Sequence, residues 1–87
     1  MTIGVAHDPV TREVVLVDRS CEAIYAFAPP SARVLASELR CAAAGGCAVL
    51  ITAVDDAGLC FQLGGQAQTA LRMAADIDSN AAIIERL

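Results

Sequence analysis

The residues of this chain that could carry out chemistry are four cysteines, Cys21, Cys41, Cys47 and Cys60, and the only histidine, His7. A thiol attacks a substrate once a positioned base deprotonates it, and cysteine with histidine is also a common ligand set for zinc. The sequence has no Cys-x-x-Cys pair and no second histidine, so His7 would have to meet a thiol through folding alone. We therefore predict no catalytic residue, no metal site and no cofactor, and expect reduced cysteines that are buried or inert.

The carboxylates add little to this chemistry. Asp55 and Asp56 are adjacent in a predicted turn, where the preference of aspartate for turns accounts for both. Asp76 and Asp78 lack the regular spacing of oxygen ligands that a calcium loop requires.

Two aliphatic runs, residues 14–17 and 49–54, indicate the elements that position these residues. Each run is short and bounded by turn residues, as in a strand covered on both faces. A chain of 87 residues has few elements with which to cover two faces of a sheet. Either helices cover one face and a partner the other, or apolar surface stays exposed.

The order of expected elements is three strands, a helix, two strands and a helix. The strands are predicted at residues 2–6, 13–18, 23–28, 47–54 and 59–63, and the first helix at 30–44, opened by proline and ended by Gly45 and Gly46. Short turns join the strands as hairpins. We predict one compact α+β domain, residues 1–87, with a largely antiparallel five-stranded sheet and both helices packed on one face.

Both helices show a stripe of apolar residues with helical spacing, which should face the sheet. In the first helix the stripe is Ala32, Leu35, Ala36, Leu39 and Ala43; in the second it is Ala67, Ala70, Leu71, Ala74, Ile77, Ala81 and Ile84. The polar run 78–80 crosses the second stripe, so this helix either continues or breaks there.

A second, narrower stripe lies on the far side of the first helix. It consists of Val34 and Cys41, flanked by Arg33 and Arg40. We interpret it either as solvated surface or as a contact for a partner, and add a separate apolar patch at the end of the chain, Ile83 and Leu87, to the candidate partner-binding residues.

Charge and hydropathy limit the classes of function. The net charge is −4, lysine is absent and aromatic residues make up 3%, which argues against a nucleic-acid surface. No apolar run approaches the roughly 18 residues of a membrane span, and the N-terminus lacks the pattern of a secretory signal, so we expect a cytoplasmic protein without a membrane partner.

The absence of a catalytic pattern and the excess of apolar sequence predict a small non-enzymatic protein that binds another protein and forms a homodimer. By analogy, one version is an accessory or inhibitor protein of a phage or other mobile element, of the anti-defence type. The alternative is a small ligand-binding protein or a thiol-dependent enzyme with its site at the dimer seam.

Overall fold

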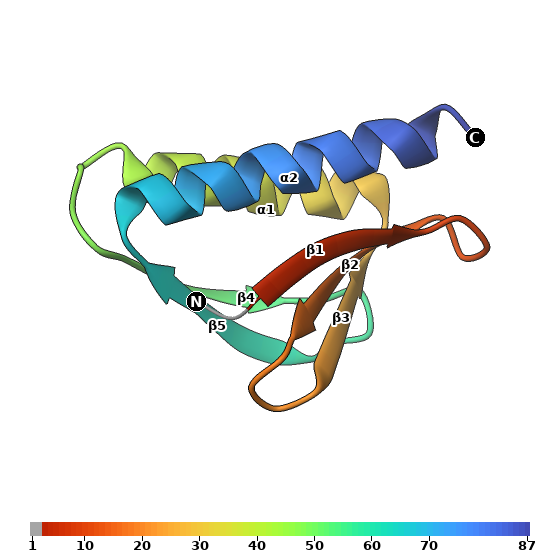
Figure 1. Ribbon diagram of the computed structural model, residues 1–87, viewed down its shortest axis with the longest axis horizontal. Coiled ribbons are helices and arrows are strands. Elements are labelled where there is room, and N and C mark those ends of the chain that lie inside the picture. Colours follow the sequence, from red (N-terminus) through yellow and green to blue (C-terminus); the bar gives the residue numbers. More distant parts are fainter. Residues whose placement is uncertain (1–2) are drawn as a thin grey trace.

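The computed structural model describes residues 3–87 and shows two helices above a set of antiparallel strands (Figure 1). The elements, in chain order, are β1 (Ile3–Asp8), β2 (Glu13–Asp18), β3 (Ala23–Phe27), α1 (Pro29–Ala43), β4 (Val49–Val54), β5 (Cys60–Gly65) and α2 (Ala67–Glu85). The predicted α+β class and its βββα-ββα order are confirmed. Thr2, the predicted first residue of the first strand, lies outside the described residues.

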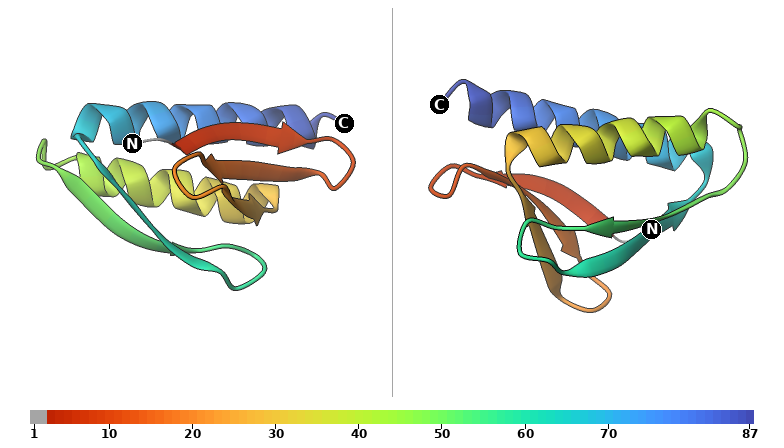
Figure 2. Two further views of the ribbon diagram at one scale, coloured as in Figure 1. Left: turned by 60° about the horizontal axis from the view of Figure 1, so that its bottom comes forward. Right: turned by 180° about the vertical axis from the view of Figure 1, so that it is seen from behind.

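The strands form two sheets where one five-stranded sheet was predicted. One sheet has the order β1-β2-β3 and the other is the β4-β5 hairpin. β3 meets the hairpin through the turn that follows β4, where the Asp56 backbone N–H donates to the Ala26 carbonyl at 3.1 Å. This local link takes the place of a continuous ladder between β3 and β4, so the hairpin lies at an angle to the larger sheet (Figure 2).

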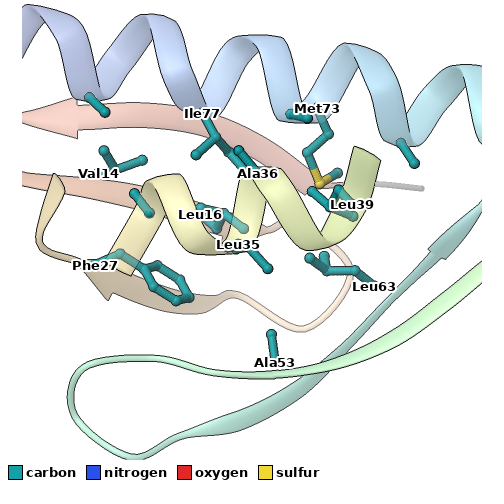
Figure 3. Packing of buried hydrophobic residues seen from close by; sticks show 14 of the residues in the cluster. Val14, Leu16, Phe27, Leu35, Ala36, Leu39, Ala53, Leu63, Met73 and Ile77 are labelled. Carbon is teal, nitrogen blue, oxygen red and sulfur yellow. The ribbon is translucent and has the colours of Figure 1, made fainter. Parts of the chain in front are cut away.

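The two helices run antiparallel, side by side, over the same side of the strands (Figures 1 and 2). The core lies between the helices, the three-stranded sheet and the hairpin, and Figure 3 shows Leu16, Leu35 and Ile77 meeting there from three elements. Each helix buries three alanines, and such small side chains let packed helices approach closely: Ala32, Ala36 and Ala43 of α1, and Ala70, Ala74 and Ala81 of α2.

Helix α1 begins with two prolines, which suit the first turn of a helix because its first N–H groups have no partner there. It starts one residue before the predicted position, at Pro29. Its buried residues are the predicted stripe without exception. The chain leaves the helix through Gly46, whose φ of 71° favours glycine.

Helix α2 continues without a break through the polar run 78–80. The reason is that two of these side chains find partners: the Asn80 amide donates to the Asp76 carbonyl at 2.8 Å, and Asp78 pairs with arginines of α1. The predicted stripe was wrong at one position. Leu71 is 46% exposed and Met73 is buried in its place, at the three-and-four spacing between Ala70 and Ile77.

The two hairpin turns of the larger sheet have the same local structure. Asp8 and Asp18 each end a strand and accept a hydrogen bond from the backbone N–H two residues later, at 2.8 Å from Val10 and 3.0 Å from Ser20. The last residue of each turn is left-handed, with φ of 58° at Arg12 and 57° at Glu22. A residue with a Cβ is strained there, and glycine is not.

This strain predicts that Arg12→Gly raises the free energy of unfolding by up to about 1 kcal/mol, because relief of the left-handed strain exceeds the added entropy of the unfolded chain. In a domain of this size that corresponds to a melting temperature about 4–8 °C higher by thermal denaturation. The control is Val10→Gly, in the same turn but outside the left-handed region, which should lower the melting temperature. Equal effects of the two substitutions would contradict the explanation.

Candidate protein-binding surfaces

The predicted contact stripe of α1 is exposed, as its helical position requires. Val34 has an exposed fraction of 59%, and Cys41 lies on the same outer side. At the end of α2, Ile83 is 40% exposed and Leu87, just beyond the helix, is 55% exposed. All four of these residues are therefore accessible to solvent.

The two arginines of the stripe have partners within the molecule that the sequence did not indicate. Arg33 bridges to Asp78 at 3.1 Å and to Glu85 at 2.5 Å, and Arg40 pairs with Asp78. All of these acidic residues belong to α2, so the ion pairs link the two antiparallel helices. Each pair is partly exposed and contributes little by itself, but Asp78 shared between two arginines forms a small network.

A groove lies between α1, the end of β3 and β4, and has a volume of about 390 Å³. We call it the α1–β4 groove. Val34 lines it, so the structure places one predicted contact residue in a real concavity. The other lining residues comprise apolar side chains, two carboxylates and two hydroxyls: Phe27, Leu35, Ala53, Val54, Glu38, Asp56, Ser31 and Thr52.

A second surface is the side of the three-stranded sheet that faces away from the helices. Side chains of a strand alternate between faces, and Val14 and Leu16 of β2 are fully buried on the helix side. Their neighbours Val15 and Val17 therefore point outward. The strand register places small or aliphatic residues beside them, and the set that we call the sheet face is Gly4, Ala6, Val15, Val17, Ile24 and Ala26.

The sheet face is accessible at its edges and half-buried at its centre. Ile24 is 60% exposed and Ala6 is exposed, whereas Val15 and Val17 are half-buried. Along β2 it is bounded by Glu13 at one end and by Arg19 at the other. The sequence indicated an apolar strand covered on both faces, but its candidate residues included none of these positions.

The cysteines were predicted to be reduced and either buried or inert, and the prediction of burial was wrong. Cys21, Cys41, Cys47 and Cys60 are all exposed and free. Cys21 lies in the second hairpin turn, Cys47 in the loop before β4, and Cys60 on the outward side of the β4-β5 hairpin, where it pairs with exposed Val54. For Cys41 and Cys60, apolar neighbours in the sequence misled the prediction, because rotation around a helix and alternation along a strand place adjacent residues on different sides. Cys21 and Cys47 lie outside the helices and strands, where no such pattern applies.

His7 is engaged in a structural contact. Its Nδ1 atom lies 2.8 Å from the Asn80 Oδ1 atom, which joins β1 to α2. Within residues 3–87, no group of three or more histidine, cysteine or acidic side chains is arranged to hold a metal ion. Nor does any helix in that range have the length and apolar character needed to cross a membrane.

The turn of Asp55 and Asp56 connects the two sheets, a role beyond the turn preference read from the sequence. The buried Asp55 carboxylate accepts hydrogen bonds from the backbone N–H groups of Ala57 and Leu59 within the turn, and of Ala26 in β3 at 3.2 Å. Asp56 accepts one from the N–H of Ala28, at 2.7 Å, immediately before α1. These bonds hold one wall of the α1–β4 groove in place.

Glu85 provides a test of the helix–helix ion pairs. Its hydrogen bond with Arg33 holds the pKa of the Glu85 carboxyl below its usual range. Because the pKa of Glu85 is lower in the folded protein than in the unfolded chain, the ion pair stabilises the fold at pH values above the usual pKa range of glutamate. This stabilisation is lost as the pH falls through the lowered pKa. We expect Arg33→Gln to return the pKa of Glu85 toward its ordinary value in an NMR titration. Arg72→Gln, an exposed position elsewhere on α2, should leave it unchanged, and a Glu85 pKa insensitive to Arg33→Gln would show that the pair is not formed in solution.

Comparison with known proteins supplies no identity for these surfaces. No protein-family model matches the chain, and searches of curated proteins and of solved structures give no significant match. The function must therefore be argued from the chain's own surfaces.

Proposed function

We propose that this chain is a non-enzymatic protein that acts by binding other proteins and that it does so as a homodimer. The observation that supports the proposal best is the sheet face, an apolar surface over three strands that the two helices leave uncovered. Contiguous apolar surface of this kind marks a site of association in soluble proteins.

Burial of the aliphatic side chains of this face supplies free energy for association. Burying a valine or isoleucine stabilises by about 1.5–3 kcal/mol relative to full exposure, and less for residues that are already half-buried. Val15, Val17 and Ile24 together offer several kcal/mol that the isolated chain does not use. A second molecule that covers the face would gain this free energy, minus the cost of association.

The α1–β4 groove is the second surface of the proposal, for a different protein partner. Its apolar lining from Val34, Leu35 and Val54 suits an apolar segment of a partner. The carboxylates of Glu38 and Asp56 favour a segment that also carries basic residues, in agreement with the net charge of −4.

The homodimer predicts a mass near twice the 9.0 kDa of the chain in light scattering at micromolar concentration. Val15→Asp should shift the protein toward the monomer, because a carboxylate buried in an apolar contact is strongly unfavourable. The matched control is Val10→Asp at a turn valine that is 89% exposed, which should keep the wild-type mass. Circular dichroism verifies that both variants fold. A wild-type protein that is monomeric at every concentration would refute the homodimer.

The groove predicts a different response at Val34. Val34→Asn should leave folding and the self-association of the chain unchanged, while weakening by about tenfold or more the retention of partner proteins in a pull-down from the native host. The control is Leu35→Asn, at a neighbouring residue that is 3% exposed, which should unfold the protein. If Val34→Asn retains the same proteins as the wild type, the groove is not the partner site.

A further inference from the structure

The outward side chains along β2 follow a charge order that a two-fold axis makes complementary to itself. From the start of the strand to just beyond its end they are Glu13, Val15, Val17 and Arg19, with an acidic group at one end and a basic group at the other. β2 is the central strand of its sheet, so this row forms the midline of the sheet face.

Two sheets packed face to face can be related by a two-fold axis in the plane between them, either along the strands or across them. An axis along β2 places Glu13 on Glu13 and Arg19 on Arg19, which is repulsive at both ends. An axis across β2 at the level of Leu16 places each Glu13 opposite Arg19 of the second copy and each Val15 opposite Val17. Only the second arrangement is both apolar at its centre and complementary in charge at both ends.

We propose that a second copy of this chain packs on the sheet face, with its β2 antiparallel to the first β2 and with Glu13 paired to Arg19 at both ends. This inference rests on the proposed homodimer and specifies its face and register. The spacing is feasible, since packed sheets lie about 10 Å apart with strands within about 30° of each other, and both side chains are long enough to span the offset.

The flanking strands agree with this register. The ladder sets Gly4 and Ile24 level with Val17, and Ala6 and Ala26 level with Val15. With the axis across the strands, Ile24 of β3 comes opposite Ala26 of the second copy, so that a large residue meets a small one. On β1, Gly4 comes opposite Ala6, and the space that these two small residues leave accommodates the guanidinium of Arg19, which lies over Gly4.

Arg19 is already positioned on this face. Its guanidinium lies over Gly4, so close that a Cβ on that residue would be 3.2 Å from the Nη2 atom. The arginine therefore lies across the sheet surface, at the end opposite the acidic residues. At the acidic end Glu13 pairs in register with Asp8, which adds a second carboxylate near the approaching arginine.

The size of the face sets the expected strength. Three strands of about six residues present an area of about 14 Å by 20 Å, which is small for a permanent dimer. The dimer should therefore dissociate on dilution and exchange subunits readily. Exchange permits a test with mixed variants.

The test reverses the charges singly and together, with sedimentation velocity as the measurement. Glu13→Arg and Arg19→Glu should each weaken self-association by about tenfold or more, because each sets like charges against one another at both ends of the interface. A mixture of the two variants should form a heterodimer, in which every pair is again opposite in charge. The double variant, Glu13→Arg with Arg19→Glu, should recover the homodimer. The control is Asp76→Arg, at an exposed position of α2, which makes the same change in charge as Glu13→Arg but away from the sheet face. This variant should associate as the wild type does.

The outcomes separate this inference from the proposed function. If the wild type is dimeric and both single variants associate as tightly as it does, the homodimer stands and the proposed face and register are wrong. Failure of the mixture or of the double variant to recover association, with all chains folded by circular dichroism, also overturns the register. A wild-type monomer at all concentrations overturns both.

Discussion

The close contact between two alanine-rich helices is the constraint on which the rest of this structure depends. Small side chains on both helices, such as Ala36 and Ala74, let α1 and α2 lie side by side, and Arg33 and Arg40 join them at the rim through Asp78 and Glu85. The pair then acts as one layer and covers one side of the strands. With no further helix in residues 3–87, the other side of the three-stranded sheet stays uncovered.

A second constraint is the junction between the two sheets. The hairpin β4-β5 shares the core through Phe61, whose ring stacks on Tyr25 at 3.8 Å between centroids. Asp55 and Asp56 fix its turn against β3 and the start of α1, because their carboxylates accept hydrogen bonds from backbone N–H groups there. Hydrogen bonds are directional, so they align these segments in a way that an apolar contact does not. The α1–β4 groove follows from this geometry, because the hairpin is held at its turn and diverges from β3 along its length.

Much of the fold could be predicted from periodicity alone, because buried residues recur at a regular spacing along each helix and strand. The stripe of α1 was correct at every position, and the order of the elements along the chain was correct, although the single five-stranded sheet was not. The predicted stripe of α2 was wrong at Leu71 because the helix turns Met73, two residues later, toward the core. Methionine is apolar and packs as well as leucine at such a position. The continuity of α2 could not be predicted, since its polar run is satisfied by Arg33, Arg40 and His7, which are distant in sequence.

The candidate surfaces were less accessible to sequence reasoning. Val34 could be found because a helix shows both of its faces in the sequence, and the structure adds the groove beside it. The sheet face was missed as a set of residues because alternation alone does not say which side of β2 the helices take. Cys60 of β5 was misplaced for the same reason. Each surface is defined by tertiary contacts, and apolar composition indicates only that such surface exists.

The two surfaces are compatible with each other because they share no residue. The sheet face uses outward positions of β1, β2 and β3, whereas the α1–β4 groove uses Phe27 on the inward side of β3 together with α1 and β4. A dimer formed through the sheet face therefore leaves a groove open on each copy. Two grooves related by a two-fold axis convert a weak single contact into a much stronger one for a partner that presents two segments, because the second contact forms at high effective concentration. In this arrangement self-association is itself the means by which a small chain with shallow surfaces achieves binding, and its dissociation on dilution makes that binding depend on the concentration of the chain.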